Sequence, residues 1–96
     1  MAKVRVIARA QAVAGKRDEL KAVLKQLVAP TRAEKGCIYY QLFESTVPDV
    51  LIFNEEWASA EDLQAHASTE RMASVQAEAA PFRLGATEVN ILTIVE

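Results

Sequence analysis

Apolar and polar residues alternate near the start of the chain with the period of two that is typical of a β-strand. Val4, Val6, Ala8 and Ala10 are separated by one residue each, and two of those three intervening residues are arginines. Successive strand residues point to opposite faces of a sheet. The pattern therefore predicts a strand over residues 3–10 with one apolar face.

Three further runs of β-branched and aromatic residues also predict strands. Residues 37–44 and 50–57 have this composition, and the five residues between them include Pro48 and Asp49. Proline and aspartate favour turns, so the two runs predict a hairpin. Residues 87–95 predict a last strand, apolar on both faces near its end.

The clearest helical pattern lies between the first strand and the hairpin. Leucines and valines recur at intervals of three and four within residues 16–28, which predicts an amphipathic helix. Because proline lacks an amide hydrogen, Pro30 is expected to kink this helix, or to stop it and let it restart through residues 31–35. Gly36 is then expected to end it in the left-handed conformation.

Two shorter helices are predicted after the hairpin. Ser59 and Asp62 have the spacing of a capping box, so a helix is expected over residues 60–67. Ser68 or Thr69 is expected to cap a further helix that ends before the next proline.

The predicted order is strand, helix, strand, strand, broken helix and strand. This α+β order is that of the ferredoxin-like fold, a split β-α-β-β-α-β sandwich with one antiparallel sheet and helices on one face. The other face of the sheet would carry branched and aromatic side chains that need a cover. A second copy is the simplest cover, so we expect a homodimer packed sheet against sheet.

The composition is that of a small soluble globular domain. The chain has 96 residues and a formal charge of −2, so we expect one domain over residues 1–96 and no nucleic-acid partner. Its first residues mix charged with apolar side chains, unlike a signal peptide or membrane span, and we expect a cytoplasmic protein without membrane contact. The single cysteine, Cys37, is expected to be a small buried apolar residue.

The only tryptophan and the only histidine, Trp57 and His66, lie where the hairpin gives way to the next helix. On a strand, Phe53, Glu55 and Trp57 point to one face, and Asn54 points to the other. An indole and an imidazole at this junction could wall one pocket.

The helix that follows brings a second stripe of side chains towards this junction. Leu63 and His66 are three positions apart, so they lie on one side of the helix. If Leu63 packs on the sheet, His66 stands at the edge of the same cavity. Met72, on the next helix, is expected to pack in the core and to reach this cavity.

Two motifs in this region resemble the antibiotic biosynthesis monooxygenase domain family. Residues 32–40 have the pattern R-x-E-x-G-C-x-x-Y, and residues 55–66 combine E-x-W with S-x-E-x-L-x-x-H. Each motif is loose alone, but the two in this order within so short a chain are fairly specific, and the resemblance covers nearly the whole chain. It implies a dimeric α+β barrel with a pocket between sheet and helices in each subunit.

The resemblance also implies an activity. Family members that oxygenate aromatic polyphenols use no flavin, haem or metal, and this chain has no glycine-rich dinucleotide motif or clustered metal ligands. The implied function is a cofactor-independent monooxygenase that oxidises a small aromatic quinol or polyphenol with molecular oxygen. The substrate is then the electron source, and the protein supplies an apolar slot, a base and a group that stabilises the oxygen-derived anion.

The resemblance assigns roles to the pocket residues. Trp57 would wall the slot, and His66 would be the base, because imidazole accepts a proton near neutral pH. Tyr39, Tyr40 or Asn54 would donate the hydrogen bond, and the two tyrosines point to opposite faces, so at most one lines a given pocket. The expected substrate-binding residues are Phe53, Glu55, Leu63 and Met72 together with Tyr39, Tyr40 and Asn54.

Structural interpretations of the same residues stay open. Trp57 could simply fill the core, and His66 could cap or pack the end of its helix.

The charged residues near the motifs also have structural interpretations. Glu55 is either a pocket acid or a strand-edge carboxylate paired with Arg5 or Arg9, the commoner outcome for such a residue. Arg32 and Glu34 are expected to form a structural ion pair near the helix end.

Other functions are also compatible with the sequence. Haem-degrading relatives place an asparagine on the first strand, and residues 4–11 contain none, which disfavours that activity. Asn54 stands where many relatives carry an aromatic or aliphatic residue, so the pocket or the opposite face is expected to be more polar. The alternatives are an isomerase or aldehyde-handling enzyme in which His66 shuttles protons, and a non-enzymatic ligand-binding module on the same barrel.

Overall fold

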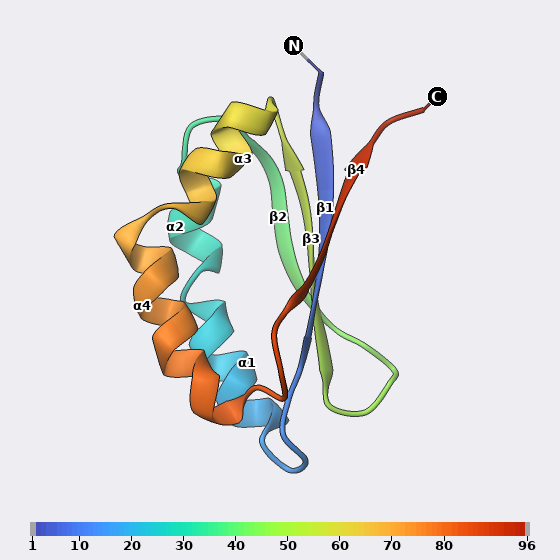
Figure 1. Cartoon of the computed structure of the whole chain (residues 1–96), viewed down its shortest axis with the longest axis vertical. Coiled ribbons are helices and arrows are strands. Elements are labelled where there is room, and N and C mark those ends of the chain that lie inside the picture. The colour runs from blue at the N-terminus through green and yellow to red at the C-terminus, as the bar shows by residue number, and fades with distance from the viewer. Residues whose placement is uncertain (1, 96) are drawn as a thin grey trace.

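One antiparallel sheet, with helices on a single face, makes up the two layers of the molecule. A computed structural model describes residues 2–95, and Figure 1 shows the helices gathered on one side of the sheet. The strand order is β2-β3-β1-β4, which confirms the predicted α+β ferredoxin-like fold. The strands are β1 (Val4–Gln11), β2 (Cys37–Glu44), β3 (Val50–Trp57) and β4 (Glu88–Thr93), and the helices are α1 (Arg17–Lys25), α2 (Val28–Arg32), α3 (Ala60–Ala67), α4 (Glu70–Ala79) and the short 3₁₀ helix η1 (Ala80–Phe82).

The core lies between the sheet and the helices. In β1 the four predicted inward residues Val4, Val6, Ala8 and Ala10 are all buried, as the alternation predicted. Leucines of α1 pack against them in the same apolar cluster. The period of two in β1 therefore identified the face that the helices cover.

The helix after β1 breaks earlier than the proline predicted. α1 ends at Lys25 and α2 begins at Val28, while Pro30 lies in the first turn of α2. The first turn of a helix does not need its amide hydrogens, so proline is tolerated there. The break occurs instead at Gln26 and Leu27, whose amides donate three residues back in the tighter 3₁₀ pattern.

The turns and caps follow the sequence closely. Asp49 takes a positive φ of 64° in the β2–β3 hairpin turn, which aspartate tolerates better than most residues. The Ser59 side chain accepts a hydrogen bond from the Asp62 amide at the start of α3, and Thr69 caps α4 in the same way. Gly36 has φ of 81°, as expected for the residue that ends the helical segment.

The opposite face of the sheet, here called the outer face, has no helix over it (Figure 1). Arg5 of β1 lies there and binds Glu56 and Asn54 of β3, and its guanidinium also lies over the Tyr39 ring. β4 is exposed along its whole length. Cys37 is half-buried at the edge of the core rather than fully buried. Within residues 2–95, no helix is both long enough and apolar enough to cross a bilayer.

Candidate active site

A cavity of about 310 Å³ lies between the inner face of the sheet and the helices. This volume is at the lower end of the range of roughly 300–1,000 Å³ that small-molecule sites occupy, which suits a ligand of one or two rings. Most of its wall is apolar. The lining residues are Val6, Ala8 and Ala10 of β1, Leu24 and Leu27, Tyr40 of β2, Phe53 and Glu55 of β3, Leu63, His66 and Ala67 of α3, Met72 and Gln76 of α4, and Arg83, Ala86, Thr87 and Val89.

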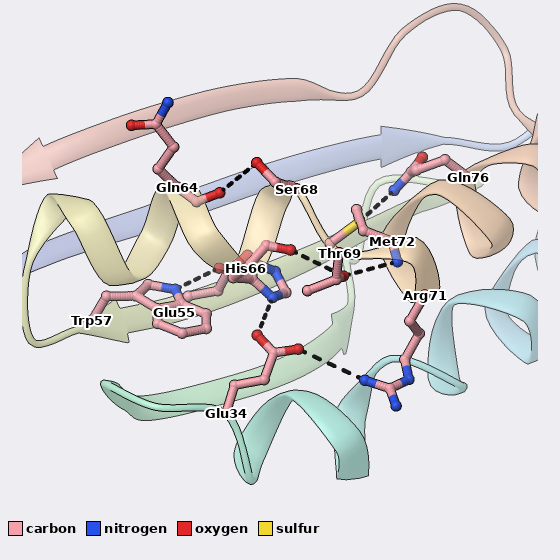
Figure 2. A network of polar contacts seen from close by, with 10 residues as sticks. All are labelled: Glu34, Glu55, Trp57, Gln64, His66, Ser68, Thr69, Arg71, Met72 and Gln76. Carbon is pink, nitrogen blue, oxygen red and sulfur yellow. Dashed lines mark hydrogen bonds and ion pairs between the residues drawn. The ribbon is translucent and has the colours of Figure 1, made fainter.

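Glu55 of β3 and His66 of α3 form the polar end of this cavity, and Trp57 of β3 contacts both from behind. Figure 2 shows the Trp57 indole beside His66, and the two rings are tilted by 31° with centroids 4.7 Å apart. The indole nitrogen of Trp57 donates a 2.9 Å hydrogen bond to Glu55 Oε1, its neighbour on the same face of β3. All three side chains are buried, Trp57 completely. The alternation of β3 therefore places Glu55 and Trp57 side by side on one face, and α3 places His66 against them.

His66 is held from its other side by Glu34, which follows α2. His66 Nδ1 and Glu34 Oε1 are 2.8 Å apart, and Arg71 of α4 approaches the second oxygen of Glu34 (Figure 2). An ionised carboxylate only accepts hydrogen bonds, so Nδ1 of a neutral His66 must carry the hydrogen. The lone pair is then on Nε2, for which no hydrogen-bond partner is found among residues 2–95. This is the tautomer that a general base needs.

Gly36 permits the close approach of Glu34 to α3. A Cβ at Gly36 would lie 2.2 Å from the Asp62 carboxylate, so a larger residue would collide with the first turn of α3. The carbonyl of Gly36 also accepts a hydrogen bond from the Ala58 amide at the end of β3. A bare backbone at Gly36 thus keeps the segment after α2 against α3.

Glu55 is the buried acid of the site. Burial raises the pKa of its carboxyl above the ordinary value, and the Trp57 hydrogen bond and the nearby His66 imidazole offset this only in part. A carboxyl with a raised pKa is a better proton donor near neutral pH than an exposed one. Since Glu55 lines the cavity, its carboxyl is within reach of a bound ligand.

Tyr40 is a further buried side chain near His66. Its ring packs against Phe53, with centroids 5.0 Å apart, and meets the His66 imidazole edge-on at 5.6 Å. Burial is the main cause that raises the pKa of the Tyr40 phenol, and the neighbouring Glu55 carboxylate raises it further. Tyr40 therefore stays a neutral phenol under physiological conditions.

Most of the predicted site residues meet at this cavity. It is lined by Tyr40, Phe53, Glu55, Leu63, His66 and Met72. Trp57 is not among the lining residues described above: it lies behind Glu55 and His66 and contacts both. Its position makes it a support for the two polar side chains rather than the wall of the slot.

Two predicted pocket residues lie on the outer face. Asn54 accepts a hydrogen bond from Arg5 there, and Tyr39 lies beneath the same guanidinium. Neither side chain can donate a hydrogen bond into a cavity on the opposite face. The reason is the strand alternation itself, since the helices cover the face that Tyr40 and Glu55 share.

The ion pairs expected for Glu55 and for Glu34 do not form. Arg5 pairs with Glu56 and not with Glu55, because Glu55 points inwards. Arg32 does not bind Glu34; it donates to the Tyr40 carbonyl and to Gln41 of β2. This leaves Glu34 to hold His66.

Sequence patterns missed two polar residues of the site. Glu34 stands in the first family motif but precedes His66 by 32 positions, and no local spacing connects them. Arg83 lines the far end of the cavity from a connection between η1 and β4 that has no periodic pattern. Within residues 2–95, no three histidine, cysteine or acidic side chains cluster in a way that could hold a metal ion.

Comparisons with known proteins place these features in one family. Residues 3–78 match the model of the antibiotic biosynthesis monooxygenase family. Rv0793 of Mycobacterium tuberculosis, whose name proposes a monooxygenase, is 32% identical over 89 residues, which cover 93% of this chain and 88% of that protein.

Solved structures agree with this relationship. The structure of Rv0793 has a TM-score of 0.91 at 29% identity, with 99% of this chain and 97% of that one covered. A Caulobacter crescentus protein, whose description proposes an antibiotic biosynthesis monooxygenase, has a TM-score of 0.89 at 29% identity, with 99% and 92% covered. A conserved protein from Methanosarcina mazei has a TM-score of 0.87 at 28% identity, with 96% and 92% covered. The chain therefore belongs to the antibiotic biosynthesis monooxygenase family.

Proposed function

We propose that this protein is a cofactor-independent monooxygenase that oxidises a small aromatic quinol or polyphenol with molecular oxygen. The observation that carries the proposal is the polar end of the apolar cavity, where a buried acid and an oriented imidazole stand together. Family membership and a relative whose name proposes a monooxygenase support the same activity.

In this proposal His66 begins the reaction. Its Nε2 takes the proton of a phenolic hydroxyl, and Glu34 stabilises the imidazolium that forms through the 2.8 Å contact at Nδ1. The phenolate is electron-rich enough to react with oxygen directly. The apolar wall holds the flat ring and keeps water away from the reacting carbon.

The oxygen chemistry draws all its electrons from the substrate. A bond forms between a ring carbon and one oxygen atom, which gives a peroxide anion that accepts a hydrogen bond from the Tyr40 phenol and a proton from the Glu55 carboxyl. The Glu55 carboxylate then takes the hydrogen of the same ring carbon as a proton, and the C–H electrons form the carbonyl while the O–O bond breaks. One oxygen stays on the ring, and the other leaves as hydroxide, which takes the proton held by His66 and becomes water. The quinol becomes a hydroxyquinone and has supplied four electrons, two from its oxidation to the quinone level and two from the new carbon–oxygen bond.

Oxygen uptake by metal-free protein tests this function. With 1,4-dihydroxynaphthalene and related quinols, the purified protein should consume oxygen faster than buffer alone. His66→Ala should lower the rate by about 10²- to 10⁴-fold, the usual contribution of a general base. Gln64→Ala is the matched control, because Gln64 is exposed on the same helix. Uptake that is unchanged in His66→Ala, or absent across a broad quinol panel, would contradict the proposal.

A second function is favoured by the same pair of side chains. Glu55 and His66 are two proton-carrying groups at one end of the cavity, and an isomerase could pass a proton between two atoms of its substrate with them. Turnover that persists without oxygen identifies this activity. Oxygen-dependent turnover rules it out for the substrate tested.

The proposal also includes a homodimer joined through the outer faces of the sheets. The aromatic and aliphatic side chains Tyr39, Phe43 and Leu92 are each at least 40% exposed there, although Arg5 and Glu56 make part of this face polar. Leu92→Glu should weaken a dimer measured by light scattering. On the same strand, Ile91 points to the other face, so Ile91→Glu is the control. A monomeric wild-type protein would refute the dimer.

A further inference from the structure

Arg83 is the only permanently charged cation among the described residues that line the cavity. It follows η1 and lies at the opposite end from Glu55. Its backbone pairs with Ala12, just beyond the end of β1, whereas Glu55 pairs with Val6. Val6 and Ala12 are six positions apart, which is roughly 20 Å of backbone at 3.3 Å per residue, and the Glu55 and Arg83 side chains both line the cavity between them. The cavity therefore has an acid and a base at one end and a guanidinium at the other.

Neutral groups alone hold this guanidinium. Nε donates to the Gly85 carbonyl at 3.0 Å, and Nη1 donates to the side-chain oxygen of Gln76. None of the ion pairs formed within residues 2–95 includes Arg83. The side chain is half-buried, so its charge is less screened than on an open surface. Its positive charge therefore has no carboxylate of the described residues within ion-pair distance.

The backbone around Arg83 is fixed before any ligand arrives. The Val13 amide donates to the Phe82 carbonyl at 2.8 Å, and the Leu84 amide donates to the Gln11 carbonyl at 2.7 Å. These two hydrogen bonds flank Arg83 on both sides. A guanidinium fixed in this way loses little conformational entropy when it binds an anion.

We infer that Arg83 binds a carboxylate carried by the aromatic ligand, at the end of the cavity away from His66. The inference rests on the proposed function because it takes this cavity as the substrate site. A guanidinium presents a planar fork of donors that matches a carboxylate better than a neutral group. Thr87, which also lines the cavity at this end, can donate a further hydrogen bond through its hydroxyl. The substrate class is thus narrowed to aromatic acids.

Binding of two inert probes tests the inference without any oxygen chemistry. 2-Naphthoate and its neutral isostere naphthalene-2-carboxamide have similar shapes and differ in charge. Calorimetry on the wild-type protein should show about tenfold or more tighter binding of 2-naphthoate. Arg83→Gln should remove that preference, and Arg83→Lys should keep part of it, since lysine retains the charge but loses the fork.

Lys25→Gln is the matched control, because it removes one positive charge from an exposed site on α1 and should leave the preference unchanged. The preference is a ratio measured on one protein, so a general loss of stability in a variant does not imitate its disappearance. Equal binding of the two probes to wild type, binding of neither, or a preference that survives in Arg83→Gln would overturn the inference. None of these results depends on oxygen uptake, so the inference and the proposed monooxygenase can fail separately.

Discussion

Glu55 and Glu56 are neighbours on β3 with the same side chain, yet they lie on opposite faces of the sheet and differ in burial and in partner. Glu55 points inwards, is 5% exposed and has an indole N–H as its partner. Glu56 points outwards and pairs with the Arg5 guanidinium. A neutral donor in a buried place leaves a carboxyl with a raised pKa, whereas a guanidinium on an open face neutralises the charge directly. One step along a strand thus separates a buried carboxyl with a raised pKa from a carboxylate in an ion pair.

Among the predicted changes, loss of the Trp57 side chain from the inner face should lower the stability of the protein most. Trp57→Ala empties a fully buried site and leaves Glu55 without its donor. The free energy of unfolding should fall by about 3–5 kcal/mol, as for other buried tryptophans. Urea denaturation followed by circular dichroism measures this. Tyr39→Ala on the outer face should cost clearly less, and equal losses would contradict the assignment of Trp57 as the support of the site.

The pH dependence of stability should distinguish the two glutamates. An acid whose pKa is raised by folding binds its proton more tightly in the native state, so stability falls as pH rises from the ordinary value of about 4.3 through the folded pKa of Glu55. Glu55→Gln should remove this loss, and the variant should gain on wild type as pH rises. Melting temperatures across this pH range provide the measurement. Glu56→Gln is the control at the adjacent position; a parallel curve for Glu55→Gln would show that Glu55 is not the cause.

The smallest change in the free energy of unfolding is expected for a substitution on the outer face. Glu56→Gln removes the partner of Arg5 where the arginine side chain is 32% exposed, so the free energy of unfolding should change by about 0–1 kcal/mol. The difference should shrink further in high salt. Denaturation at two ionic strengths tests this. A loss as large as that of Trp57→Ala would mean that the outer face is as tightly coupled as the inner one.

The alternation along β3 was enough to predict which residues share a face. It placed Glu55 with Trp57, the alternation along β2 separated Tyr39 from Tyr40, and the structure agrees with both. In these two strands both faces carry apolar residues, so the alternation alone did not say which face the helices cover, and Asn54 remained a pocket candidate.

Contacts between distant segments were beyond the reach of local patterns. The Glu34 and His66 contact joins the segment after α2 to α3, and the two residues come together only when both segments pack on the same sheet. Arg83 lies in a connection whose position is fixed by its bridge to Ala12. Helix ends were similarly affected, since Pro30 was accommodated in a first turn rather than at a break.

The strand order has a consequence for how the protein behaves at high concentration. β4 is an edge strand whose only hydrogen-bonded neighbour among the described strands is β1, and it carries Val89, Ile91 and Leu92 with 45–61% of their surface exposed. An apolar strand with open backbone groups along one edge is a template for further strands. Unless a partner covers it, β4 is where self-association into insoluble aggregates would begin.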